Sequence, residues 1–227
     1  MLKNFIDILT APTAALARIK QNPTFLAPLL LLLVMTIAST CGYMLLNDEG
    51  FVRDQMVEQA SNFRDMTKEQ RAAVEKAVEK QSLTTQAVVS SVAIAILIPV
   101  VLSISAAYLA LMAKFSSAQL GFRHWFALIC WTSVPSFFSN LAALLVLLTD
   151  SVGQVPQSDL NVLGLIHLLN LNIHSQTLER FGLMQIWALA LGVIGYRQWT
   201  GTSWLNACLI SLAPTVVIYG AILYFTL

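Results

Sequence analysis

The chain has 227 residues, of which 57% are hydrophobic and only 11% are charged, and its formal net charge is +1. Soluble domains carry about a quarter charged residues, so this composition excludes an ordinary soluble globular protein. The sequence also lacks the basic, aromatic surface that is typical of nucleic-acid-binding proteins. We therefore expect an integral membrane protein with no nucleic-acid partner.

Residues 1–24 form an amphipathic segment. Leu2, Phe5, Ile6 and Leu9 recur at helical spacing before Pro12 interrupts the pattern. The pattern predicts one or two short helices that lie in the cytoplasmic headgroup layer.

Five stretches are candidates for crossing the bilayer, which requires about 20 mostly apolar residues. They are residues 25–46, 87–113, 125–149, 181–199 and 204–227. The fourth is the weakest candidate, because its uninterrupted apolar stretch ends at Tyr196 and its fit depends on Arg180 and Arg197 reaching out to the headgroups. The expected fold is an all-α integral membrane protein, a single membrane domain over residues 1–227 with five transmembrane helices.

Charge in the connecting segments predicts the orientation. The segments before the first span, between the second and third, and between the fourth and fifth have an excess of Lys and Arg, which marks cytoplasmic segments. Residues 47–86 hold six basic and eight acidic residues, and residues 150–180 hold three acidic and one basic. We expect a multi-pass protein of the bacterial inner membrane with a cytoplasmic N-terminus and a periplasmic C-terminus.

The connection at residues 47–86 has a helical pattern and is long for an unstructured loop. Thr67-Lys68-Glu69-Gln70 matches a capping box, which marks the start of a helix. The pattern predicts an outer helical hairpin that continues the first and second spans outward and turns near residues 65–67. Its interleaved charges indicate a face in contact with solvent. A docking surface for a protein partner is the alternative interpretation.

The spans contain no Asp, Glu, Lys, Arg or His between their interfacial ends. This absence weighs against an ion-coupled or proton-coupled carrier. Pro99, Pro135 and Pro214 lie inside three of the spans with hydroxyl side chains nearby, which is typical of kinks and packing. Asn140 is the strongest polar candidate, because an amide in hydrocarbon is expected to bond to another helix.

No catalytic, cofactor-binding or metal-binding motif is present, and Cys41, Cys130 and Cys208 have no ligand-like spacing. We expect no enzyme activity, cofactor or metal.

The connection at residues 150–180 contains a leucine-rich stretch, residues 160–176. On a helix, His167, Asn170 and His174 fall within one narrow polar stripe. The pattern predicts a helix over residues 160–173 that lies in the outer interface or dips in and returns, and this choice stays open. His167 and His174 are two turns apart, too far to share a metal ion, so a pH-responsive edge is the remaining functional alternative.

Three segments of the chain point to a known family. They are FIDILTAPTAALARIKQNP running into PLLLLLV, DMTKEQRAAVEKAVEKQ, and QIWALALGVIGYRQWTGTS before the last span. Together they resemble the bacterial branch of the Yip family, the Ypt/Rab-interacting membrane proteins. The resemblance implies a five-span helical membrane protein with a cytoplasmic N-terminus. In eukaryotes the family acts with Rab GTPases through a long N-terminal region. Only about 24 residues precede the first span here, so we do not expect Rab binding.

Two functions remain open from the sequence. One is a non-enzymatic membrane protein that organises or binds membrane lipids or a protein partner, with homo-oligomer formation also open. The alternative is a passive lipid scramblase, transporter or channel through the proline-kinked helices. The absence of charged residues in the spans favours the first function. The Ser and Asn residues of the third span leave the second function open.

Overall fold

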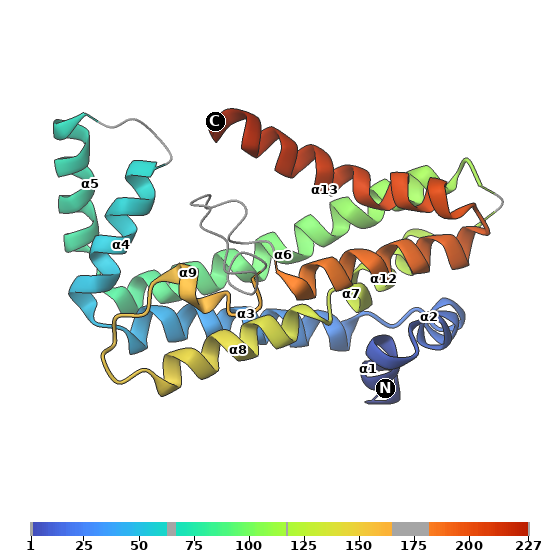
Figure 1. Ribbon diagram of the computed structural model, residues 1–227, viewed down its shortest axis with the longest axis horizontal. Coiled ribbons are helices and arrows are strands. Elements are labelled where there is room, and N and C mark those ends of the chain that lie inside the picture. Colours follow the sequence, from blue (N-terminus) through green and yellow to red (C-terminus); the bar gives the residue numbers. More distant parts are fainter. Residues whose placement is uncertain (1, 63–66, 117, 165–181, 227) are drawn as a thin grey trace.

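The computed structural model describes residues 2–62, 67–116, 118–164 and 182–226 (Figure 1). Within these ranges every regular element is an α helix. The helices are α1 Leu2–Thr10, α2 Pro12–Gln21, α3 Leu26–Leu46, α4 Glu49–Asn62, α5 Lys68–Lys80, α6 Leu83–Ala113, α7 Phe122–Thr132, α8 Ser136–Thr149, α9 Gln157–Leu160, α12 Leu183–Thr200 and α13 Trp204–Thr226.

Four segments in the described part of the chain are long and apolar enough to cross a membrane. They are α3, α6, the pair α7–α8 and residues Trp204–Ala221 of α13. Helix α12, with 18 residues, is not among the four, and it contains Gln185, Arg197 and Gln198. The expectation of an all-helical membrane protein is confirmed for these segments.

The long helices run alternately in opposite directions along one axis (Figure 1). Helices α1 and α2 lie at one end of this bundle, and α4 and α5 lie at the other. Helix α3 packs against α6 and α8, α6 packs against α7, and α12 packs against α13 and α2. Although α12 is short, it runs antiparallel to α13, as the other long helices run antiparallel to those that follow them in the chain (Figure 1).

The third expected span is divided into α7 and α8 at Ser133–Pro135. Pro135 has no N–H to donate to the carbonyl oxygen of Trp131, and that oxygen accepts instead from the N–H of Val134 at 3.2 Å. By contrast, α6 continues through Pro99 and α13 continues through Pro214.

Helices α4 and α5 pack against each other at the end of the bundle opposite the N-terminus. The expected capping box is present. Gln70 N–H donates to the Thr67 hydroxyl at 3.3 Å, and the Gln70 side-chain oxygen accepts from Thr67 N–H at 3.0 Å. Arg53 of α4 donates to the carbonyl oxygens of Val78, in the last turn of α5, and of Gln81, which follows that helix. The residues of the expected turn before Thr67, 63–66, lie outside the described residues.

The two helices do not continue the spans in a straight line as the sequence suggested. Both α4 and α5 lie across the direction of α3 and α6 (Figure 1). Non-helical residues separate them from their spans, at Asn47–Asp48 and at Gln81–Ser82. Ser82 then caps α6, because its hydroxyl accepts from Thr85 N–H at 3.1 Å.

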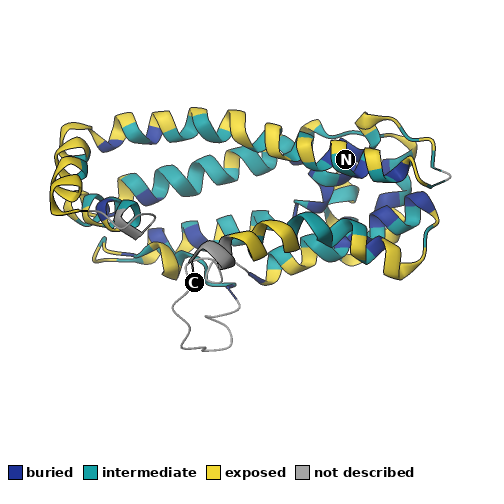
Figure 2. Cartoon of the chain, turned by 90° about the horizontal axis from the view of Figure 1, so that it is seen from above, coloured by how far each residue is buried: buried dark blue, intermediate teal, exposed yellow. Residues whose placement is uncertain are grey.

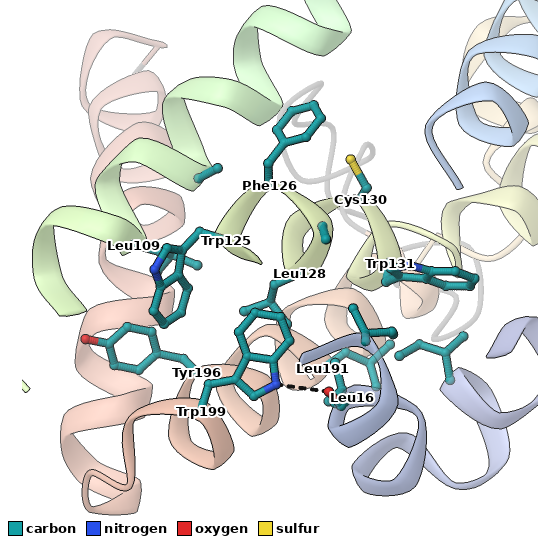
Figure 3. Close-up of a cluster of buried hydrophobic side chains, with 14 of the residues drawn as sticks. Leu16, Leu109, Trp125, Phe126, Leu128, Cys130, Trp131, Leu191, Tyr196 and Trp199 are labelled. Atoms are coloured by element: carbon teal, nitrogen blue, oxygen red, sulfur yellow. Dashed lines mark hydrogen bonds between the residues drawn. The ribbon is translucent and has the colours of Figure 1, made fainter. Parts of the chain in front are cut away.

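The main hydrophobic core lies at the N-terminal end of the bundle, where the buried residues gather (Figure 2). Trp125, Tyr196 and Trp199 form its aromatic centre, and Leu16 of α2 packs beside them (Figure 3). The ring centroids of Trp125 and Tyr196 are 5.5 Å apart, and those of Trp125 and Trp199 are 5.7 Å apart. Such tilted aromatic pairs stabilise a core beyond their buried area.

The N-terminal helices belong to this core. Ile8, Leu16 and Ile19 are fully buried, at 0% exposure, whereas Leu2 and Ile6 remain exposed. Helix α2 therefore packs against protein, in particular against α7 and α12, and α1 packs against α2.

Helices α7 and α12 approach closely at Gly195. A Cβ atom added there would lie 2.4 Å from Cδ1 of Leu128, which is itself fully buried. Gly192, one turn earlier, has no atom within 4 Å of its Cβ position. A side chain at position 195 would therefore require Leu128 to shift, whereas position 192 has open space.

We predict that Gly195→Ala lowers the thermal unfolding temperature in detergent by roughly 2–12 °C, because overpacking costs about 1–3 kcal/mol. Gly192→Ala is the matched control, and we expect it to be neutral or stabilising because alanine favours helix. Equal unfolding temperatures for the two variants would contradict the close approach at Gly195.

Candidate functional site

Asn140 lies on α8 and bonds to α3. Its side-chain oxygen accepts from the Ser39 hydroxyl at 2.7 Å, and its side-chain N–H donates to the Ser136 carbonyl oxygen one turn earlier at 3.0 Å. The expected partner on another helix is therefore Ser39. The bond ties two apolar helices together where both face the interior of the bundle.

The other candidate residues of the sequence analysis, His167, Asn170 and His174, lie outside the described residues. The residues next to that segment lie close together. Leu183 N–H donates to the Leu163 carbonyl oxygen at 2.8 Å, and Gly164 pairs with Gly182. Both ends of the segment therefore meet at one place, and the expected helix at residues 160–173 stays a prediction.

Asn140 lines two cavities. The first, which we call the α3–α4 cavity, has a volume of about 600 Å³ and lies between α3, α4, α8 and residues 156–161. Five hydroxyl and five amide side chains line it. The hydroxyls belong to Ser39, Thr40, Tyr43, Ser139 and Ser158, and the amides belong to Gln55, Gln59, Asn140, Gln157 and Asn161.

One carboxylate lies among the described residues that line the α3–α4 cavity. Among the described residues, Glu58 is the only charged side chain that lines it. Tyr43 is 4% exposed, and its hydroxyl has no hydrogen-bond partner among the described residues. The described part of the cavity wall therefore presents neutral polar groups and one carboxylate.

The second cavity, which we call the central cavity, has a volume of about 480 Å³ and lies between α6, α7, α8, α12 and α13. Its polar lining includes Ser105, Ser136 and Ser211, each from a different span with an internal proline or a proline break. The buried Ser211 hydroxyl oxygen has no hydrogen-bond partner in the described part of the chain. At one edge, Gln185 of α12 donates to the Tyr219 hydroxyl of α13 at 2.9 Å.

The two cavities share Ser139, Asn140 and Asn161 in their walls. The amide of Asn140 thus stands at the junction of two polar spaces inside an otherwise apolar bundle. A polar group buried in such surroundings requires hydrogen bonds, which the Ser39 and Ser136 contacts provide for Asn140.

Asn47 positions the segment that completes the α3–α4 cavity. Its side-chain N–H donates to the carbonyl oxygens of Tyr43 and Val155, at 3.1 and 3.4 Å, and its side-chain oxygen accepts from Val155 N–H at 3.0 Å. Asp48 N–H also donates to the Gly153 carbonyl oxygen at 2.6 Å. These bonds hold residues 153–155 against the end of α3, so that residues 156–161 form one wall of the cavity.

Sequence reasoning found Asn140 and missed Ser39, Tyr43 and Asn47. Ser39 and Tyr43 sit in an apolar run where small and aromatic residues are common, so their types alone gave no signal. Asn47 lies at the end of the span and resembles an ordinary loop residue. Its contacts with residue 155 depend on the tertiary fold.

Metal-ligand chemistry has no support among the described residues, because they contain no group of three or more His, Cys, Asp or Glu side chains that could hold an ion. Cys41, Cys130 and Cys208 are free cysteines.

A family model described as the Yip1 domain matches residues 6–225, nearly the whole chain. The chain belongs to the Yip1 family. The resemblance noted in the sequence is therefore confirmed, and the chain is a multi-pass membrane protein of this family. No curated protein and no solved structure matches it.

Gly195 and Tyr196 are adjacent residues of α12. This Gly-Tyr pair lies in the aromatic core at the contact between α7 and α12. Its position indicates a packing role for the pair in this Yip1-family chain, remote from the Tyr43 and Glu58 side chains that line the α3–α4 cavity.

Proposed function

We propose that this Yip1-family protein is a non-enzymatic protein of the bacterial inner membrane that organises or binds lipid or protein partners. In this proposal the N-terminus is cytoplasmic, the C-terminus is periplasmic, and α4 and α5 project on the periplasmic side. The excess of basic residues in the opposite connections supports this orientation.

The proposal includes α12 as a fifth crossing. Its C-terminal end is bonded to α2 at one end of the bundle, and its N-terminal end follows the Gly164–Gly182 contact. At ~1.5 Å per residue, 18 residues extend about 27 Å, which approaches the thickness of the hydrocarbon core. The guanidinium of Arg197 lies 4.2 Å from the centroid of the Trp204 ring, a pairing suited to the membrane interface.

The observation that carries the proposal is the exposed charged surface of α5. In α5 only Val74 and Val78 are half-buried, and every other side chain is exposed. Arg53 fixes α5 to α4 through the Val78 and Gln81 carbonyl oxygens, so the surface is held in a defined orientation. A helix that presents so little apolar surface to its own bundle is suited to contact a partner protein.

Photo-crosslinking in living cells tests this surface. We expect a crosslinker at Ala72, Lys76 or Glu79, which share the outward face of α5, to capture the same discrete species. Position 78 is the matched control, because it is half-buried and lies beside the Arg53 contact, and we expect a weaker product there. The result that overturns the proposed protein contact is a uniform pattern at all four positions, or no product at any of them.

A second candidate function is favoured by the two cavities. The α3–α4 cavity and the central cavity share Asn140 in their walls, and both have polar side chains in their lining. Such cavities are suited to passive movement of a lipid headgroup or a small solute. The absence of charged residues inside the spans weighs against coupled transport and leaves a passive route.

Reconstitution into liposomes separates the two functions. Under the organising function, labelled lipids and small solutes cross no faster than in empty vesicles. Rapid crossing that Asn140→Leu slows would establish the passive route, because the variant replaces the amide shared by both cavities. Asn206→Leu is the matched control, since Asn206 is exposed at the start of α13 and lines neither cavity.

A further inference from the structure

Basic residues gather at the α2 end of the bundle, where α1, α2 and the α6–α7 and α12–α13 connections lie together (Figure 1). The sequence of this end, residues 1–25, 113–125 and 196–206, contains six Lys or Arg residues and a single acidic residue, Asp7. Asp7 already forms an ion pair with Arg18. The other five basic residues, which we call the basic collar, are Lys3, Lys20, Lys114, Arg123 and Arg197.

The longer segments outside the described residues adjoin other parts of the bundle. Segment 63–66 lies between α4 and α5 in the chain, and these helices are at the opposite end. Gly164 and Gly182, on either side of segment 165–181, meet at the end of α12 that lies away from Arg197. The α2 end therefore has an excess of positive charge.

Two cations of the collar are held in place by uncharged partners. The Lys20 ammonium group donates to the Trp199 carbonyl oxygen at 3.1 Å, and the guanidinium of Arg123 donates to the Pro23 carbonyl oxygen at 3.2 Å. A carbonyl group carries no net charge, so these bonds fix the cations without neutralising them. The collar thus presents positive charge at defined positions around the ends of α2 and α7.

Exposed aromatic side chains accompany the collar. The Arg197 guanidinium lies 4.2 Å from the centroid of the Trp204 ring, and Trp204 is itself exposed. Phe115 and Phe122 adjoin collar residues in the chain, and Phe115 is 86% exposed. These positions directly follow or begin the spanning segments. Cations and aromatic rings at the ends of spans lie at the level of the lipid headgroups.

Helix α1 adds an aliphatic surface to the same end. Its Phe5 ring packs on the ring of Trp131 in α7, with the centroids 4.8 Å apart. Leu2 and Ile6, one turn apart, are exposed, and the neighbouring Lys3 is exposed as well. Helix α1 therefore packs one apolar face on the protein and presents a second beside a lysine. This pattern is typical of helices that lie at the boundary between headgroups and acyl chains.

The combination of charge and apolar surface selects the partner. A soluble acidic macromolecule would match the cations and leave the aromatic and aliphatic side chains in water. An anionic lipid surface offers phosphate groups to the cations and an apolar layer to the other side chains. In a zwitterionic lipid, the positive group of the headgroup opposes the phosphate charge, so the attraction to the collar is weaker.

We propose that the basic collar binds the phosphate groups of anionic phospholipids in the leaflet at the α2 end, while Leu2 and Ile6 enter the apolar boundary of that leaflet. This inference rests on the lipid part of the proposed function and specifies the class of lipid by its charge.

Native mass spectrometry of the full-length protein tests the inference. The protein is exposed to equal amounts of phosphatidylglycerol, phosphatidylethanolamine and phosphatidylcholine with identical acyl chains. We expect phosphatidylglycerol to be retained at least about fivefold more than either of the others, because each Lys or Arg near an anionic surface contributes about this factor. Raising the ionic strength of the exchange buffer from about 0.1 M to about 1 M reduces the preference, since the screening length falls about threefold.

Charge variants locate the binding at the α2 end. We expect Lys114→Gln to reduce phosphatidylglycerol retention about fivefold and Lys114→Arg to preserve it, because the charge alone is required. Lys76→Gln is the matched control, since it removes the same charge from an exposed lysine of α5 at the opposite end of the bundle. Lys114 and Lys76 are both exposed, so we expect all three variants to unfold near the temperature of the unmodified protein.

The outcomes separate this inference from the proposed function. Equal retention of the three lipids, or equal losses in Lys114→Gln and Lys76→Gln, overturns the basic collar as an anionic-lipid site and leaves a general lipid contact. Retention of no lipid at all overturns the lipid part of the proposed function as well. Inorganic phosphate at the lipid concentration identifies the source. Lack of displacement supports the lipid, and complete displacement overturns it in favour of a free anion.

Discussion

The contact between α2 and the end of α12 determines how this bundle is built. The indole N–H of Trp199 donates to the Leu16 carbonyl oxygen at 3.1 Å (Figure 3). The Lys20 ammonium group donates to the Trp199 carbonyl oxygen, also at 3.1 Å. Gln198 adds a bond to the Thr13 carbonyl oxygen at 2.9 Å. These bonds fix the weakly apolar α12 to the end of the bundle at which the chain begins.

The two ends of the bundle differ in their packing, and this difference gives them different roles. At the α2 end, Trp125, Tyr196 and Leu128 fill the space, and Gly195 allows α7 and α12 to approach. At the α4 end, the helices enclose polar cavities that share Asn140 in their walls. The first end is suited to hold the helices together, and the second is suited to bind a protein partner.

Several local features could be predicted from the sequence. The capping box at Thr67 depends on four adjacent residues, and a strongly apolar run such as Leu26–Leu46 needs no tertiary information to be identified. The need of Asn140 for a partner also followed from its surroundings.

Other features depend on contacts between distant residues. The identity of Ser39 as the partner of Asn140 depends on the packing of α3 on α8. The sequence also does not distinguish Pro135, where the helix breaks, from Pro99 and Pro214, where it continues. The cavity wall at residues 156–161 depends on the bonds of Asn47 to Val155, across 108 positions of sequence. Sequence periodicity contains no information about such pairs.

We propose that α12 crosses the membrane, so that the chain passes through it five times. Reporter fusions after Arg123 and after Leu227 test this claim most directly, because three crossings separate the two positions in a five-span chain. We expect the fusion after Arg123 to report the cytoplasmic side and the fusion after Leu227 to report the periplasmic side. Signals from the same side at both positions would contradict the five-span arrangement.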